Sequence, residues 1–190
     1  LKKTIKNDRK NTKNQTRKNK IKCFGEYIIY MLKSLNCKYV YGYQGGSITD
    51  FIDLIAKDKD LEYVNCRSEG NAALSAFAEA KMKINQENTI SCCITTSGPG
   101  ASNLLTGIID SNLDRQRVIF ITGSHNLFDI SLGEFQNIKQ EYIFESAGVR
   151  DSHFISDVEN GVRILKNALS NSLKFYRPCH LAVPKDFFNK

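Results

Sequence analysis

The chain has 190 residues, 41% of them hydrophobic, which is enough for one domain with a substantial core. Its net charge of +7 lies at one end, because residues 1–22 carry ten Lys or Arg against one acid, whereas the remaining residues carry 17 bases and 19 acids. No apolar run in these residues approaches the roughly 20 residues that cross a bilayer, so we expect a soluble protein. The six cysteines form no CxxC pair and lack the spacing of a zinc finger, so we expect reduced thiols in the cytoplasm.

Residues 1–22 are predicted to form a disordered basic tail. Only Leu1 and Ile5 are large and apolar before Ile21, so the segment cannot bury enough surface to offset the entropy of ordering. A nucleic-acid-binding arm is the functional alternative, but no aromatic residues are interleaved with the charges for base stacking, and we do not expect nucleic acid as a partner. A transit-peptide remnant stays open, since the segment is basic and the chain starts at Leu instead of Met.

From residue 23 onward, helical and strand-like apolar patterns alternate. In chain order, we expect a helix over 23–36, a strand over 39–43, a helix over 48–56, a strand over 61–66, a helix over 69–82, a strand over 89–96, a helix over 101–113, a strand over 118–122, a long polar loop from 123 past 136, a helix over 156–173 and a strand over 178–183. Ser47 is the expected N-cap of the second helix, and residues 156–159 form a capping box for the last one. About five strands alternating with helices predict an α/β fold, a single doubly wound, mostly parallel sheet formed by residues 23–190.

Three features that can bind a ligand follow expected strands. They are the glycine loop 42–46, the segment 67–70 and the turn 97–100. In open α/β sheets, ligands bind beyond the carboxyl ends of the strands, and glycines let a flat ring approach the backbone. Each loop alone is equally typical of an ordinary turn between a strand and a helix. Glu69 is likewise either a residue that caps its helix or a functional acid, and its sequence position alone leaves both open.

Six segments in a fixed order resemble the pyrimidine-binding, N-terminal domain of thiamine-diphosphate-dependent enzymes of the acetolactate synthase and pyruvate oxidase type. The segments are YGYQGGS from residue 41, CRSEGNAALSAFAEA from 66, ITTSGPGASNLLTGIIDSNLD from 94, VIFITG from 118, GEFQ from 133 and PCHLAVPKDF from 178. The resemblance runs from about Phe24 to Phe187. The sequence departs from the family pattern at Gln44 and Arg117, where the family commonly has Pro.

The resemblance implies a role for individual residues. Glu69 would be the catalytic residue, which hydrogen-bonds a ring nitrogen of the cofactor's aminopyrimidine and so promotes loss of the thiazolium proton. The other residues that the resemblance places against the cofactor are Gly45, Gly46, Gly98, Pro99, Gly100 and Asn103. Gln44, Phe135 and Gln136 would lie on the substrate side. No residue of this chain is expected to bind a metal.

The resemblance also implies what the chain needs besides itself. The family binds the diphosphate through Mg²⁺ held by a Gly-Asp-Gly segment in another domain, and this chain contains no Gly-Asp-Gly. We therefore expect thiamine diphosphate as cofactor, with Mg²⁺ held elsewhere, FAD as an open further cofactor, and no turnover by the chain alone. The implied assembly is a homodimer or tetramer formed through the pyrimidine domain.

The implied activity is that of a carboligase that decarboxylates a 2-keto acid such as pyruvate and joins the product to a second keto acid. A pyruvate oxidase or a keto-acid decarboxylase subunit is the alternative closest in chemistry. From a different class, the alternative is a non-catalytic relic that dimerises through the helices at 69–82 and 101–113, although the presence of Glu69 argues against it. We expect His125, His153 and His180 to be structural or exposed, since they are isolated from one another in the sequence.

Overall fold

A computed structural model describes residues 21–129 and 135–190. The elements are α2 (Phe24–Ser34), β1 (Tyr39–Gly42), α3 (Thr49–Lys57), β2 (Glu62–Asn65), α4 (Glu69–Met82), β3 (Ser91–Thr95), α5 (Pro99–Ser102), α6 (Leu105–Leu113), β4 (Val118–Ser124), α7 (Gln140–Ser146), β5 (Asp151–Phe154), α8 (Val158–Phe175), β6 (Cys179–Pro184) and the 3-10 turn η2 (Lys185–Phe187). All but two residues of the predicted tail lie outside the described residues, so the boundary at residue 22 stays a prediction.

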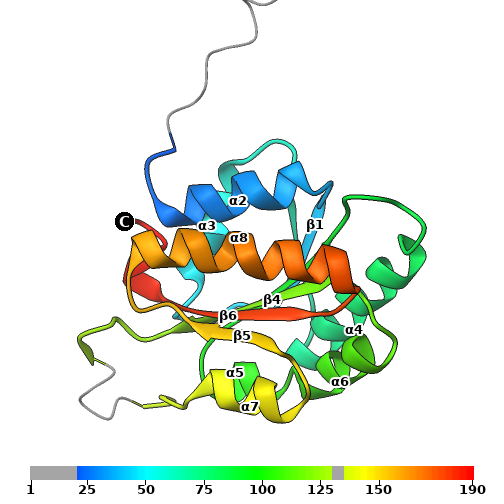
Figure 1. The fold of residues 1–190 in the computed structure, drawn as a ribbon. Coiled ribbons are helices and arrows are strands. Elements are labelled where there is room, and N and C mark those ends of the chain that lie inside the picture. The colour runs from blue at the N-terminus through cyan, green and yellow to red at the C-terminus, as the bar shows by residue number, and fades with distance from the viewer. Residues whose placement is uncertain (1–20, 130–134) are drawn as a thin grey trace, which may run out of the picture.

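The strands form one sheet in the order β2-β1-β3-β4-β6-β5, and every neighbouring pair is parallel. The predicted doubly wound α/β fold is therefore confirmed, with a wholly parallel sheet. Helices cover both faces, as Figure 1 shows: α2, α3 and α8 lie on one side of the strands, and α4 to α7 lie on the other.

Alternating residues of the central strands supply two separate cores. In β3, Cys92 and Ile94 pack against the α2, α3 and α8 side, whereas Cys93 packs against the side of α4, α6 and α7. In β4, Ile119 likewise packs on the side of α2, α3 and α8, and Phe120 packs on the side of α4, α6 and α7. Because both faces are covered, all of β3 and β4 is buried, which explains why their sequences are continuously apolar or small instead of alternating with charges.

The structure corrects several expectations about single elements. The predicted helix over 101–113 is divided into α5 and α6, and the region after residue 136 contains α7 and β5, which the sequence did not predict. The cap of α8 is Asp157, whose carboxylate accepts a hydrogen bond from the backbone N–H of Asn160 at 2.7 Å, so the predicted capping box at 156–159 is wrong, because it needs the cap at Ser156. The predicted cap role of Ser47 is wrong, because α3 begins at Thr49 and its N-cap position is Ile48.

Candidate functional site

Glu69 is the first residue of α4 and lies four residues after Asn65, the end of β2. Ser68 is the N-cap, and its hydroxyl accepts a hydrogen bond from the backbone N–H of Asn71 at 3.3 Å. The helix start is thus capped by the serine, and the Glu69 side chain is free to point elsewhere. That side chain is half-buried and faces the start of the chain segment that follows β3.

The two carboxylate oxygens of Glu69 have different surroundings. Oε2 accepts a hydrogen bond from the side-chain amide of Asn103 at 3.2 Å. Oε1 has no hydrogen bond with the residues that the structure describes, and it lies 3.6 Å from the point where a Cβ on Gly100 would stand. One oxygen is therefore fixed by the protein while the other remains available beside a residue that has no side chain.

The turn after β3 is shaped by its glycines. Gly98 has a φ of 64°, a conformation that L-residues adopt only at a cost, and Pro99 then begins α5 with its fixed φ. A Cβ on Gly98 would lie 2.6 Å from the backbone oxygen of Gln136, so the loop that carries Gln136 lies directly on this turn. The structure thus brings together Glu69, Gly98, Gly100, Asn103 and the backbone of Gln136.

The glycine loop after β1 joins the same edge of the sheet. A Cβ on Gly45 would collide with the side chain of Thr96, at the end of β3. The Ser47 hydroxyl lies 2.8 Å from the hydroxyl of Thr96 and accepts a hydrogen bond from the backbone N–H of Ser97 at 3.0 Å. Ser47 therefore links the two glycine segments instead of capping a helix.

Other predicted site residues lie at this edge and make no hydrogen bond to Glu69 among the described residues. Gln44, Gly46 and Pro99 are exposed, and no atom lies within 4 Å of a Cβ placed on Gly46. The Phe135 side chain is 81% exposed. These positions border open space, and their assignment to a cofactor or substrate stays a prediction. Thr96 and Ser47 were missed as parts of the site, and no local signal identifies them, since the contact joins residues 49 apart.

His180 does not contribute an acid or base to this arrangement. His180 is fully buried in β6, where its ring stacks on Phe144 and its nitrogens pair with the hydroxyls of Thr122 and Ser152. Burial, with a smaller contribution from His153, lowers the pKa of His180 to about 3, so the ring is neutral at physiological pH. His180 thus has a structural role, as expected from the sequence.

In residues 21–129 and 135–190, no group of three His, Cys, Asp or Glu is arranged to bind a metal ion. Nor does any helix in these residues have the length and apolar character needed to span a membrane.

A parallel, doubly wound sheet with a carboxylate and two glycine turns at the carboxyl ends of its strands is typical of α/β domains that bind a cofactor ring. Residues 23–159 match the family model described as thiamine pyrophosphate enzyme, N-terminal TPP binding domain, and the chain belongs to this family. Thiamine pyrophosphate is another name for thiamine diphosphate, so the predicted family is confirmed.

Relatives with established names agree with this family. The chain is 30% identical over 162 residues to acetolactate synthase isozyme 2 large subunit of Escherichia coli, an alignment that covers 85% of this chain and 28% of that protein. It is 35% identical over 114 residues to an acetolactate synthase large subunit of Cyanidium caldarium, covering 58% and 19%. It is 28% identical over 121 residues to a pyruvate oxidase of Lactiplantibacillus plantarum, covering 63% and 19%. The chain therefore matches less than a third of the length of each.

Proposed function

We propose that the chain is the N-terminal domain of a thiamine-diphosphate-dependent 2-keto acid carboligase of the acetolactate synthase type, with Glu69 as the residue that activates the cofactor ring. One observation carries the proposal: Glu69 Oε2 is held by Asn103, whereas Oε1 has no hydrogen bond in the described part of the chain and faces Gly100. A carboxylate fixed in this way is suited to exchange a proton with a ring nitrogen of a bound aminopyrimidine.

The residues around Glu69 fit a flat ring. Gly100 leaves the space beside Oε1 open, since a side chain there would stand between Oε1 and Thr96. Gly98, Pro99 and Gly100 would form the floor under the ring, and Gly45 and Gly46 would border it from the loop after β1. Asn103 would fix the carboxylate, and Gln44, Phe135 and Gln136 would lie toward the substrate.

Bound thiamine diphosphate supplies a thiazolium carbon that adds to the keto group of a 2-keto acid such as pyruvate. The contribution of this chain is to hold and move the proton at Glu69 Oε1. Within the proposal, the diphosphate and Mg²⁺ are bound by a domain outside these 190 residues, FAD is an open further cofactor, and the protein works in the cytoplasm as a homodimer or tetramer. The names of the acetolactate synthase relatives support the carboligase reaction, and the pyruvate oxidase relative supports the alternative of an oxidase.

The direct test replaces Glu69 by Gln in the complete gene product and measures acetolactate formation from pyruvate with thiamine diphosphate and Mg²⁺. Glutamine keeps the size of the side chain and the contact with Asn103 but cannot exchange the proton, so we expect turnover to fall by about 10²–10⁴-fold. Thiamine diphosphate binding, measured by calorimetry, should change much less than turnover.

The matched control is Glu159→Gln. Glu159 also lies in the first turn of a helix, α8, but it is exposed and belongs to a different part of the molecule. This variant should retain its turnover. Near-normal turnover of Glu69→Gln would contradict the proposed role. Acetaldehyde instead of acetolactate, or acetyl phosphate when phosphate and O2 are supplied, would assign the chain to the decarboxylase or oxidase alternative without affecting the role of Glu69.

A further inference from the structure

A cavity of about 510 Å³ lies far from the candidate site, at the opposite edge of the sheet. Its walls come from the end of α6, from the end of α7 and the segment after it, and from the segment between α8 and β6. They include Asn112, Arg115, Glu145, Gly148, Arg150 and Arg177. These segments lie where β4, β5 and β6 begin, whereas Glu69 and the glycine turns lie where strands end (Figure 1). A ligand in this cavity would therefore not take part in chemistry at Glu69.

The charge of the cavity is not balanced. Arg115, Arg150 and Arg177 line it, and Glu145 is the one acid that does so, which leaves the lining side chains with a formal charge of +2. None of the three guanidinium groups forms a hydrogen bond or ion pair with the described residues. The acids adjacent in sequence are already engaged, since Asp114 pairs with Lys81 at 2.7 Å and Asp151 accepts a hydrogen bond from Asn171 at 3.1 Å.

The backbone is fixed at two of the three arginines, Arg115 and Arg177, and at Gly148 between them in the sequence. Arg115 has a φ of 53°, in the left-handed region where glycine is preferred at a helix end, and its N–H bonds to the Asn112 carbonyl at 3.3 Å. The wall that follows α7 contains Gly148, which has a φ of 90°. A Cβ on Gly148 would lie 2.5 Å from the side-chain nitrogen of Asn112, so the two segments are in close contact. Arg177 is bonded at both backbone groups to Ser172, through its N–H at 3.3 Å and its carbonyl at 2.6 Å.

We propose that this cavity binds a small molecule with two negative charges, either a phosphate group or a dicarboxylate, through Arg115, Arg150 and Arg177. The volume lies within the range of small-molecule sites. Planar guanidinium groups bind phosphate and carboxylate oxygens in pairs, and a dianion balances the charge of +2. A second explanation for the arginines is that they offset the partial negative charge at the carboxyl ends of α6, α7 and α8, and the test separates the two.

The test titrates the protein with inorganic phosphate and, separately, with succinate by calorimetry, with total ionic strength held constant by NaCl. Three variants are compared: Arg115→Gly, Arg150→Gln and Arg177→Gln. Each should weaken binding about tenfold or more, as expected for the loss of a charge-assisted hydrogen bond. Arg115→Gly is the most informative change, because glycine suits the φ of 53°, so this variant should keep or raise its Tm while it loses affinity.

The matched control is Arg163→Gln, on the exposed side of α8, where Arg163 bonds only to Asn160 of its own helix at 2.8 Å among the interactions described. It should leave binding unchanged. Binding of phosphate alone assigns the site to phosphate compounds, and binding of succinate alone assigns it to dicarboxylates. No binding of either anion, equal affinity in all four variants, or a lower Tm in the three cavity variants without a loss of affinity would overturn the proposal in favour of a purely structural role.

Discussion

The surroundings of Glu69 bear on the choice that the sequence left open between a capping residue and a functional acid. Ser68 already accepts the hydrogen bond that a cap provides at the start of α4. The Glu69 carboxylate instead bonds to Asn103, which lies 34 residues further along the chain. A residue that only capped its helix would not need this long-range partner, so the geometry favours the functional interpretation.

Gly100 lies so close to Thr96 that a side chain at this position would crowd it. A Cβ at this position would lie 2.8 Å from Thr96 Cγ2, and Thr96 cannot rotate away without losing its contact with the Ser47 hydroxyl. We expect Gly100→Ala to lower the free energy of unfolding by about 1–3 kcal/mol, which is typical of overpacking, as measured by denaturant unfolding. The added methyl group should also weaken thiamine diphosphate binding by the complete gene product, because it stands beside Glu69 Oε1.

Gly46→Ala is the control for this prediction. Gly46 lies in the other glycine loop, and a Cβ placed on it meets no atom within 4 Å. The change should alter the free energy of unfolding by less than about 0.5 kcal/mol. Equal effects of the two alanine substitutions would show that crowding against Thr96 is not what requires glycine at position 100.

Local sequence patterns identified Glu69 and the glycines as candidate site residues but misassigned Ser47, because the partners of Ser47 are distant in the sequence. Glu69 and the glycines stand out because each sits at the junction of a strand pattern and a helix pattern. Ser47 also precedes a helix pattern, and local rules therefore predicted a cap. Its actual partners, Thr96 and Ser97, are 49 and 50 residues away, and such pairings depend on which strands become neighbours.

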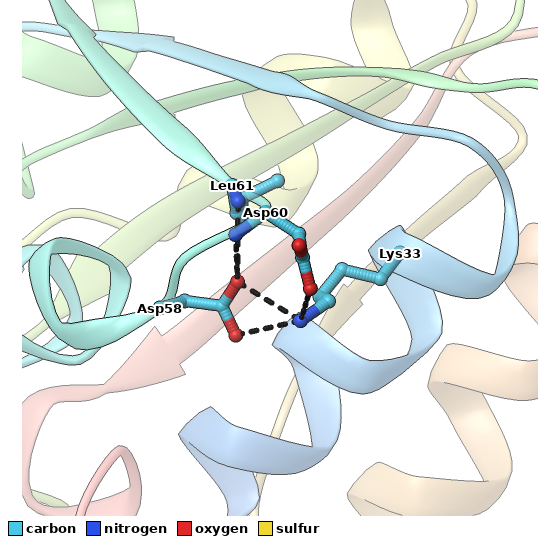
Figure 2. A network of polar contacts seen from close by, with 4 residues as sticks. All are labelled: Lys33, Asp58, Asp60 and Leu61. Atoms are coloured by element: carbon cyan, nitrogen blue, oxygen red, sulfur yellow. Dashed lines mark hydrogen bonds and ion pairs between the residues drawn. The ribbon is translucent and has the colours of Figure 1, made fainter.

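At the scale of elements, a charged network joins α2 to the segment between α3 and β2. Figure 2 shows the Lys33 ammonium group between the carboxylates of Asp58 and Asp60, at 2.8 Å from an oxygen of each. Asp58 also accepts hydrogen bonds from the backbone N–H groups of Asp60 at 2.9 Å and Leu61 at 3.1 Å. The network thus fixes the turn that leads into β2 and ties that turn to the first helix.

This network predicts a pH dependence of stability. Burial acts to raise the pKa of Asp58, but the hydrogen bonds from Lys33 and from the backbone of Asp60 and Leu61 outweigh it and lower the pKa below the ordinary 3.8. The stabilisation by Asp58 is therefore complete above about pH 4 and is lost as the pH falls through the lowered pKa of the folded state. Because both side chains are partly exposed, its size should not exceed about 1 kcal/mol.

The measurement is the difference in unfolding free energy between the native protein and Asp58→Asn, from denaturant unfolding at several pH values. The difference should be constant between pH 5 and 8 and shrink below pH 4. Asp53→Asn serves as the control, since Asp53 is exposed on α3, the helix that ends just before Asp58, and forms no ion pair with the described residues. A difference that does not change with acidity would show that folding does not lower the pKa of Asp58, and it would contradict the stabilising role of the network.

The elements that the sequence predicted are those with long or continuously apolar patterns. β3, β4, α4 and α8 were all expected, because burial on both faces or a long apolar stripe leaves a clear signal. The two missed elements are short. α7 has seven residues, and β5 has four, with the polar sequence DSHF at the edge of the sheet. An edge strand such as β5 forms because it pairs with the neighbouring strand, so its own sequence is only a weak signal for a strand.

At the scale of the whole molecule, the strand order explains why two glycine turns meet. The chain leaves β1 through α3 toward β2 on one side, and leaves β3 through α5 and α6 toward β4 on the other. The loops after β1 and β3 diverge from neighbouring strands, which opens the sheet edge at that point, as in other open α/β sheets. The alternation of elements predicted the class of fold, but the placement of β6 between β4 and β5 depends on packing that no local pattern records.

The same arrangement leads to a prediction for the chain on its own. The candidate site offers a carboxylate and glycine turns for the uncharged ring, but the diphosphate is highly charged and needs a metal ion or cationic groups to leave water. Within the described residues no group of three His, Cys, Asp or Glu is arranged to bind a metal ion, and the three arginines of the cavity lie at the opposite edge of the sheet. We therefore expect calorimetry of the 190-residue chain with thiamine diphosphate and Mg²⁺ to detect no micromolar binding, and pyruvate consumption to stay at background. Micromolar, Mg²⁺-dependent binding would mean that these residues hold the diphosphate themselves, and the division of the cofactor between two domains would have to be abandoned.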